Sequence, residues 1–599
     1  MVTTEKGSIS IHTENIFPII KKFLYSDHEI FLRELVSNAT DASQKIKSLS
    51  GLGEYTGELG DLEITVKLDK EAKTITISDK GIGMTADEIK KYINQIAFSG
   101  AKEFLETYKE QTTEQIIGQF GLGFYSAFMV ASQVEIITKS HKDEPAARWI
   151  CDGSTEFEIT AADKTERGTD IILHVAPDSE EFLDEYRLEG ILKKYCRFMP
   201  LPIKIGETHI NATEPLYTKS PRSLEDKDYL DFYQALYPYA EEPLFWIHLN
   251  VDYPFNLTGI LYFPKVKNEM EMNKHKVQLY SKQVFITDEL KDVMPEFLTL
   301  LHGVIDSPDI PLNVSRSYLQ ADKNVKQLSD YIMRKVADKL NELFKESREA
   351  YEKKWEAIGL FVKYGYISEP KFEERAKDIL LVKNTEGKYF STIEYTEFVQ
   401  AAQTDKNNKV VFLYANEPKK QDFYVSNAKA KGYDVLEFEK NPVDDYFVRH
   451  LGMKLENVVI RSVDSATADK LIEQEIKIES ILSDDEVTKL KDGVRTTLNL
   501  GENEVITEAM SPTDMPIQVV EDEMFRQFAH MMPNAGGNGF NFTKVVVNTN
   551  HPLATKFLAN QEANADAVWQ AYDLALLSLN KLDGERLTSF IKRSLSLIS

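Results

Sequence analysis

Cysteine is almost absent from this sequence, which contains two in 599 residues. Cys151 and Cys196 lie far apart, outside any CxxC pair and without paired histidines near them. This pattern excludes a disulfide framework and gives no indication of a zinc site. We therefore expect both residues to be thiols of the protein core.

Long hydrophobic runs are also missing. No stretch approaches the roughly 18 to 20 uninterrupted apolar residues that cross a membrane. The opening segment MVTTEKGSISIHTENIF has no signal-peptide pattern. The sequence thus predicts a cytoplasmic protein that does not contact a membrane.

Positive charge is scarce, with 71 Lys and Arg against 96 Asp and Glu and a net charge of −25. A protein that binds nucleic acid needs basic side chains to replace the counterions of the phosphates, so nucleic acid is not an expected partner.

The chain is also too long for one hydrophobic core, and the usual domain size predicts roughly three to five domains.

The segment FLRELVSNATDA, residues 31–42, places Glu34, Asn38 and Asp41 at i, i+4 and i+7. A helix would align these oxygen-bearing side chains on one face. The residues between them that would face a core are Leu35, Ala39 and Ala42. A carboxylate one turn from an amide oxygen suits the orientation of water beside a metal ion. Taken alone, the pattern is more often that of an ordinary solvated helix face.

A second segment, KTITISDKGIGMTADEI, alternates as a strand through Ile75 and Ile77 and then turns at Asp79. A carboxylate at a strand end accepts a hydrogen bond from an exocyclic amine, and Gly81 and Gly83 permit close backbone approach. The arrangement fits the edge of an adenine, although an ordinary turn also explains DxGxG.

Two further segments complete the pattern. In IIGQFGLGFYSAFMVA, three glycines precede an apolar run that we expect to be a buried helix, which suits phosphate binding at a helix N-terminus. The spacing is neither GxxxxGK[ST] nor GxGxxG, so a different nucleotide fold is needed. In ERGTDIILHV, the hydroxyl of Thr169 precedes an alternating strand, where it could complete a base pocket.

Taken in order, ELVSNATDA, DKGIGMT, GQFGLGF and RGT resemble the nucleotide boxes of the GHKL superfamily, which includes gyrase, heat shock protein 90, histidine kinases and mismatch-repair MutL. IGQFGLGFYSAFMVA and the later GVIDSPDIPLNVSRSYLQ, residues 303–320, are similar to the bacterial heat shock protein 90 family. The resemblance implies an α+β or α/β multidomain fold. It would comprise an N-terminal GHKL (Bergerat) α/β sandwich, an α/β middle domain and a mostly helical C-terminal dimerisation domain.

The resemblance also implies domain boundaries. An N-terminal ATP-binding domain would cover 1–207, with a lid at about 96–123, and a short linker would follow at 208–223. A middle domain would cover 224–482 and a dimerisation domain 490–599. Within the middle domain, KVVFLYANEP and the later GYDVLEF predict a strand-helix-strand unit.

Residue roles follow from the same resemblance. Glu34 would be the base or orienter of the attacking water, Asn38 would bind magnesium together with the phosphates of ATP, and Asp79 would accept the adenine amine. The other residues implied to bind nucleotide are Gly83, Met84, Gly118, Gln119, Phe120, Gly121, Gly123, Phe124 and Thr169.

Arg316 resembles the arginine that reaches the γ-phosphate from the middle domain, with Asn313 and Gln320 as supporting groups. The planar guanidinium keeps its charge and matches phosphate oxygens, and such a residue is worth about 10³ to 10⁵ in the rate of phosphoryl transfer. Without the surrounding PLNVSRSYLQ, a surface salt bridge would explain Arg316.

The chain departs from the family pattern at several positions. KKYINQIAFSG puts Tyr92 and Phe98 where relatives usually carry Asn and Lys. Lys80 takes a position usually held by Asn, and Ser317 one usually held by an acidic residue. We expect altered nucleotide affinity or lid kinetics rather than lost hydrolysis.

The last hundred residues contain three apolar stripes. Met and Phe side chains recur at helical spacing within 524–532, either as core or as an adaptable surface for clients. Two more stripes lie near the end of the sequence: Val568, Tyr572, Leu576 and Leu579, then Leu587, Phe590, Ile591 and Leu595. The resemblance implies that these two helices pair with a second copy as a four-helix contact.

The implied function is that of an ATP-driven chaperone. A homodimeric clamp would use ATP and Mg²⁺ to open and close around unfolded or partly folded clients, and co-chaperones would be further partners. One alternative is a nucleotide-regulated holdase without significant hydrolysis, which Tyr92 and Phe98 keep open. Another is a topoisomerase or MutL ATPase, which the acidity disfavours. A histidine kinase would need a phosphoacceptor helix before the nucleotide boxes.

Overall fold

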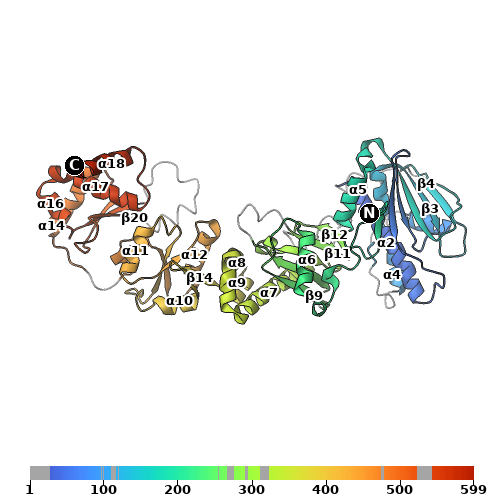
Figure 1. Ribbon diagram of the computed structural model, residues 1–599, viewed down its shortest axis with the longest axis horizontal. Helices are drawn as coiled ribbons and strands as arrows, with labels where there is room; N and C mark the ends of the chain where they lie inside the picture. The colour runs from blue at the N-terminus through green and yellow to red at the C-terminus, as the bar shows by residue number, and fades with distance from the viewer. Residues whose placement is uncertain are drawn as a thin grey trace, which may run out of the picture. The chain divides into compact units, whose positions relative to one another are not determined.

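The computed structural model (Figure 1) divides into two compact units, Met1–Val336 and Ala337–Ser599, each described by itself. The description covers 27–598 except for 96–97, 99, 109–115, 119–120, 155, 254, 266–275, 291–293, 311–322, 474–477 and 522–542. Among the helices in these ranges, none is long and apolar enough to span a bilayer.

The first unit begins with an eight-stranded sheet of order β5-β4-β3-β6-β2-β1-β7-β8. Its strands are β1 Ile64–Asp69, β2 Thr74–Asp79, β3 Ala131–Lys139, β4 Ala147–Cys151, β5 Glu158–Ala161, β6 Gly168–Val175, β7 Ile203–Ile205 and β8 Thr208–His209. The alternation predicted for β2 is confirmed, because Ile75 and Ile77 are buried while their neighbours are partly exposed. Asp79 is the last residue of that strand.

Helices cover one face of this sheet (Figure 1). They are α2 Ile30–Gly51, α3 Ala86–Tyr92, α4 Gly100–Tyr108, α5 Glu185–Tyr195 and the 3-10 helices η3 Gly123–Met129 and η4 Pro177–Leu183. The helix predicted over 31–42 is part of α2, which packs against β2 and η3. Phe31 and Leu35 are fully buried there, and each contributes roughly 1.5 to 3 kcal/mol of burial free energy.

The apolar run after Gly123 is a 3-10 helix of seven residues rather than a longer buried helix. Strand β3 begins at Ala131, and a 3-10 helix rises further per residue than an α-helix, so it covers the short span between the glycine turn and the strand. Cys151 and Cys196 are both buried free thiols, as predicted.

A second sheet in this unit has the order β12-β11-β13-β10-β9. Its strands are β9 Phe245–Val251, β10 Leu257–Phe263, β11 Val277–Ser281, β12 Val284–Thr287 and β13 His302–Asp306. The flanking helices are η5 Leu216–Thr218, η6 Pro221–Ser223, α6 Asp226–Leu236 and η7 Glu296–Leu300. Buried tyrosines from α6 and the strands, among them Tyr233 and Tyr262, form its core.

The second unit contains a five-stranded sheet of order β15-β14-β17-β16-β18. Its strands are β14 Leu381–Asn384, β15 Tyr389–Ser391, β16 Val410–Ala415, β17 Val435–Glu437 and β18 Val458–Ser462. Helix α7 Lys323–Glu346 contains the boundary between the two units, and the helices that follow it are α8 Arg348–Ser368, α9 Pro370–Ala376, α10 Thr392–Val399, α11 Asp422–Ala430, α12 Pro442–Lys454 and α13 Ala468–Leu471. Strands β16 and β17 are parallel and joined through α11, so the strand-helix-strand prediction is confirmed.

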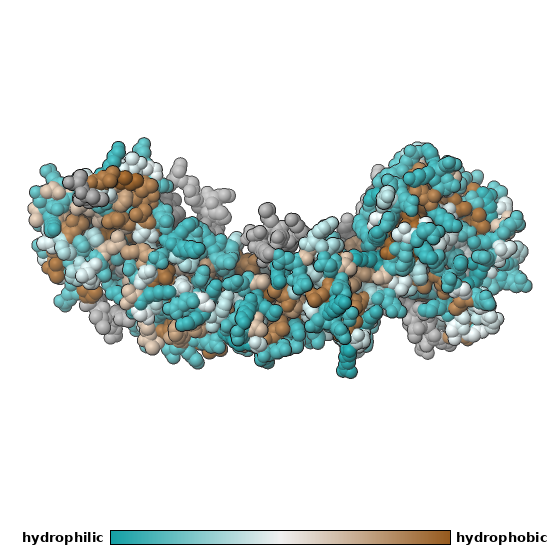
Figure 2. Space-filling view, viewed as in Figure 1, coloured by the Kyte–Doolittle hydropathy of each residue, from teal (hydrophilic) through white to brown (hydrophobic). Residues whose placement is uncertain are grey.

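In the part of this unit that the structure describes, a three-stranded sheet, β19-β21-β20, and the helices α14, α16, α17 and α18 follow. Their bounds are β19 Val505–Glu508, β20 Ile517–Glu521, β21 Thr543–Asn548, α14 Asp484–Leu498, α16 Pro552–Ala559, α17 Gln561–Ser578 and α18 Gly584–Ile598. The first terminal stripe is largely buried on α17, but Ile591 and Leu595 of the second are 48% and 61% exposed. Figure 2 shows hydrophobic side chains at the surface over α18. The stripe within 524–532 lies outside the described residues.

The mixed α/β multidomain fold class is confirmed by these sheets and helices. The boundaries at 207, 224–482 and 490–599 stay predictions.

Candidate functional site

A cavity of about 550 Å³ opens in the first unit between α2, the ends of β2 and β6, and the helices α3 and α4. It gathers many of the residues singled out in the sequence: Glu34, Asn38, Asp79, Gly83, Met84, Gly118, Gly121, Gly123, Phe124 and Thr169. Gln119, Phe120 and Arg316 lie outside the described residues, as do Asn313, Gln320 and parts of the lid segment 96–123.

The polar face of α2 forms one wall of this cavity. Glu34 is 5% exposed and receives two hydrogen bonds from Arg33, at 3.0 Å from Nε and 2.8 Å from Nη2, both to Oε1. A β-carbon at position 123 would lie 2.7 Å from Oε2 of Glu34. Gly123 therefore lets the loop pass close to the second carboxylate oxygen. Nothing in the local sequence pattern indicated the pair with Arg33.

Asp41 fixes the loop that faces α2. Its two carboxylate oxygens accept the backbone N–H groups of Ile117 and Gly118, each at 2.6 Å. A β-carbon on Gly118 would approach Oδ2 of Asp41 to 2.9 Å. Asp41 thus positions the glycine segment, while the amide of Asn38, between Glu34 and Asp41, makes no side-chain hydrogen bond to the part of the chain that the structure describes.

Asp79 lies at the opposite end of the cavity. Its carboxylate is 7% exposed and accepts the N–H of Gly81 at 2.7 Å. Burial raises the pKa of Asp79 to about 7, although the N–H groups of Gly81 and Thr169 oppose that shift. Gly83 has φ +63°, and a β-carbon there would overlap the carbonyl of Lys139. The turn after β2 therefore requires glycine both for its conformation and for its contact with β3.

Thr169 is the register partner of Asp79 in the β2–β6 pair. Its hydroxyl lies 2.9 Å from the hydroxyl of Thr138, which also accepts the N–H of Met84 at 2.9 Å. Strands β3 and β6 and the segment after β2 that contains Met84 are thereby linked through hydroxyl groups. The pattern leaves Asp79, Thr169 and Met84 together at one end of the cavity.

Tyr92 and Phe98 form an aromatic wall of the cavity. Their rings are stacked with centroids 6.0 Å apart. The hydroxyl of Tyr92 donates to Glu103 at 3.1 Å, and the ammonium of Lys91 binds the same carboxylate at 2.7 Å. These contacts join α3 to α4, and the cavity remains open beside the two rings.

Several carboxylates that line the cavity are already paired. Glu88 binds Lys142 at 2.7 Å, and Glu54 accepts the hydroxyl of Tyr108 at 2.6 Å. Lys45 also lines the cavity, and it forms no ion pair with any residue in the described ranges. Burial lowers the pKa of Lys45, and the nearby carboxylates, Asp41 first, oppose that shift.

Sequence reasoning missed Lys45. Its position four residues after Asp41 places it on the same helix face as Glu34 and Asn38, because residues i and i+4 are neighbours on a helix. That spacing was the signal that could have found it.

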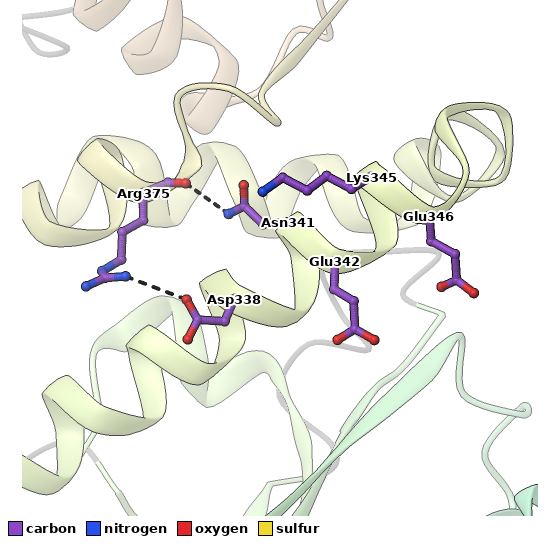
Figure 3. A pocket seen from close by; sticks show the side chains of 6 residues that line it. All are labelled: Asp338, Asn341, Glu342, Lys345, Glu346 and Arg375. Carbon is purple, nitrogen blue, oxygen red and sulfur yellow. Dashed lines mark hydrogen bonds and ion pairs between the residues drawn. The ribbon is translucent and has the colours of Figure 1, made fainter.

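A second hollow, on the other unit, has a different character (Figure 3). Asn341 donates to the carbonyl of Arg375 at 3.0 Å, and Asp338 lies 3.6 Å from its guanidinium. Figure 3 shows the carboxylates of Glu342 and Glu346 pointing away from this group. None of the residues predicted for a site lies here, so we interpret it as ordinary polar surface.

Comparison with known proteins gives matches over nearly the whole chain. Residues 204–577 match the family described as Hsp90 protein, and residues 25–171 match the one described as Histidine kinase-, DNA gyrase B-, and HSP90-like ATPase. Chaperone protein HtpG of Porphyromonas gingivalis is 48% identical over 94% of this chain and 86% of that protein.

Two other relatives extend the comparison. Chaperone protein HtpG of Bacteroides thetaiotaomicron is 44% identical over 99% of this chain and 100% of that protein. The mitochondrial TNF receptor-associated protein 1 homolog of Dictyostelium discoideum is 30% identical over 97% of this chain and 84% of that protein.

The raised pKa of Asp79 leads to a stability prediction. The folded-state pKa of about 7 exceeds the ordinary 3.8, so Asp79 stabilises the fold at low pH and this contribution is lost as pH rises through 7. Between pH 5 and 8 the free energy of unfolding of the wild-type protein should fall by about 2 to 3 kcal/mol more than that of the Asp79→Asn variant. Calorimetric unfolding at both pH values measures the difference.

The control for this prediction is Asp61→Asn, because Asp61 is exposed. Its unfolding should follow the wild-type pH dependence. Identical pH dependence in the Asp79→Asn variant and the wild-type protein would contradict a raised pKa at Asp79.

Proposed function

The chain belongs to the Hsp90 protein family, and from this premise we propose that it is an ATP-dependent molecular chaperone for unfolded or partly folded proteins. The N-terminal part belongs to the HSP90-like ATPase family, and the related HtpG proteins are named as chaperones. The observation that carries the proposal is one cavity with a buried carboxylate at one end and, at the other, an oxygen-lined helix facing a glycine turn.

Adenine would occupy the end of the cavity at Asp79. The ionised carboxylate would accept a hydrogen bond from the exocyclic amine, and the turn that contains Gly83 borders this end of the cavity. Met84 and Phe124 supply apolar contacts, and the hydroxyl of Thr169 completes the polar edge. Asp79 is thus proposed as the residue that selects adenine.

The phosphates would face α2 and the glycine turn. Asn38 fits the role of Mg²⁺ ligand because its amide oxygen points from the same helix face as Glu34 and is not committed to another described group. The metal ion would neutralise phosphate charge. Asn38 and the glycine segment at 118–123 would hold the phosphates in place.

Glu34 would orient the attacking water and take its proton. Arg33 binds one carboxylate oxygen, Oε1, and so holds the group in a single orientation. Oε2 lies toward Gly123 at the glycine turn. Arg316 as the residue that reaches the γ-phosphate stays a prediction, since it lies outside the described residues.

Lys45 is the cation that this proposal adds. The pocket would receive a polyanion beside several carboxylates, and Lys142 and Lys91 are committed to Glu88 and Glu103. Because Phe98 replaces the usual lysine, Lys45 is the lining ammonium left for the phosphate chain. An ammonium that meets phosphate in a partly buried site forms a charge-assisted hydrogen bond.

Assembly as a homodimer is part of the proposal. Leu574 and Leu577 on α17 are 41% and 45% exposed, Ile591 and Leu595 on α18 are also exposed, and the two helices contact each other. A second copy would cover these side chains in a helical contact.

The chaperone relatives disfavour a DNA-directed ATPase. The cavity beside Tyr92 and Phe98 leaves room for nucleotide, and a phosphate-release assay distinguishes the proposed ATPase from a holdase without significant hydrolysis.

Loss of the Glu34 carboxylate should lower the rate of ATP hydrolysis much more than it lowers the affinity for ATP. The Glu34→Gln variant keeps an oxygen for Arg33 but loses the basic oxygen, so ATP hydrolysis should fall by about 10² to 10⁴ while the affinity for ATP stays near wild type. Phosphate release and calorimetric titration measure the two quantities. Glu54→Gln, which removes a carboxylate at the other side of the cavity, is the control, and an unimpaired rate in Glu34→Gln would remove Glu34 from the mechanism.

Lys45 should discriminate ATP from adenosine. In Lys45→Gln the affinity for ATP should fall roughly 10-fold because one charge-assisted hydrogen bond is lost, whereas the affinity for adenosine should not change. Lys142→Gln is the matched control, since that lysine lines the same cavity but is paired with Glu88. Equal losses for ATP in both variants, or a loss for adenosine in Lys45→Gln, would contradict the assignment.

A further inference from the structure

The hairpin between β11 and β12 has a turn that is unfavourable for its residues. Ser281 pairs with Val284, so Lys282 and Gln283 form a two-residue turn, with φ values of 53° and 64°. Hairpins of this type usually use Asn and Gly, because left-handed backbone is strained for residues with long side chains. Strained residues persist only where the surrounding structure holds them.

Asp306 holds this turn. It is the last residue of β13 and is 6% exposed. Its carboxylate accepts the N–H of Gln283 at 2.7 Å and the hydroxyl of Tyr217 at 3.2 Å. Burial raises the pKa of Asp306 to about 6, opposed first by the N–H of Gln283. A buried carboxylate is thus committed to keeping the turn in its left-handed conformation.

The hairpin also packs against the first sheet and its helices. Val284 is fully buried in the hydrophobic core of that part of the unit. The ring of Phe285 lies 5.9 Å from the ring of Tyr195 on α5. The turn is therefore fixed both to its own sheet and to the layer that contains the candidate nucleotide cavity.

From this position the side chain of Lys282 reaches the loop beside that cavity. Its ammonium donates to the carbonyl of Ile116 at 2.5 Å. The next two residues, Ile117 and Gly118, donate their N–H groups to Asp41 on α2. Three consecutive residues are thus held by two different elements: Lys282 of the second sheet binds the carbonyl of Ile116, and Asp41 of α2 binds the next two backbone N–H groups.

We propose that Lys282 is a positioning residue for the nucleotide cavity, through which the second sheet sets the place of Gly118 against α2. The proposal rests on the proposed ATPase function, since Gly118 lines the cavity. Coupling of this kind is reciprocal. A nucleotide that displaces residues 116–118 must therefore also weaken the contact of Lys282, and loss of that contact must loosen the loop.

Hydrogen exchange on the full chain tests the contact without requiring turnover. In Lys282→Met, exchange at the amides of Ile117 and Gly118 should become about 5-fold faster or more. Local opening of the loop then costs less free energy, because it no longer has to break the hydrogen bond from Lys282. Exchange in α2 should not change. Lys282→Arg, which keeps a donor, should restore protection. Lys276→Met is the control, because Lys276 is an exposed lysine immediately before the same hairpin.

Steady-state kinetics on the same variants test the functional consequence. Because misplacement of a cavity loop lowers the rate more than ground-state binding, Lys282→Met should lower kcat for ATP about 5-fold and change KM less than 2-fold. Lys282→Arg should recover most of the rate.

Two results would overturn the proposal. One is exchange at Ile117 and Gly118 that equals wild type in Lys282→Met, and the other is the same acceleration in Lys276→Met. If the wild-type chain hydrolyses no ATP, the ATPase proposal fails and the exchange measurement still decides the role of Lys282.

Discussion

Buried carboxylates on α2 are the constraint on which the cavity depends. Glu34 and Asp41 are 5% and 4% exposed, and an ionised carboxylate withdrawn from water is costly unless it is paired or hydrogen bonded. Glu34 is satisfied by the adjacent Arg33, whereas Asp41 is satisfied by the N–H groups of a distant loop. The need to satisfy Asp41 therefore brings the glycine segment to α2, and the same helix presents Asn38 and Lys45 to the space between them.

Local sequence patterns predicted the elements of this site well. The fold class and the resemblance to the Hsp90 family are confirmed, and α2, β2 and the parallel β16–β17 unit follow their predicted periodicities. Local patterns do not reveal which residues form hydrogen bonds with each other across the fold. The bond between Asp41 and Gly118 joins residues 77 positions apart, and that between Lys282 and Ile116 joins residues 166 positions apart. No period within one segment carries such information, so these contacts needed the tertiary structure.

Tyr92 and Phe98 give one wall of the cavity an aromatic surface without closing the cavity. The two rings are stacked, and contacts of this wall with Lys91 and Glu103 tie α3 to α4. Phe98 brings no positive charge to the cavity, while the ammonium of Lys45 on α2 forms no ion pair with the described residues and lies 5.9 Å from the centre of the Phe104 ring. In the proposed ATPase, the ammonium that meets the phosphates and the carboxylate that orients the water would therefore both belong to α2.

Asp79 and Asp306 show how the same costly group serves two purposes. Each ends a strand, each is buried, and each holds a turn through a backbone N–H, of Gly81 and of Gln283 respectively. Asp306 is enclosed by Tyr217 and the turn, whereas Asp79 lines the cavity. A carboxyl group whose pKa is raised toward neutrality costs folding free energy at physiological pH, and a neutral amide could hold either turn without that cost. The carboxylate of Asp306 holds the strained turn that carries Lys282. The carboxylate of Asp79 faces an open cavity, where it could accept a hydrogen bond from a ligand.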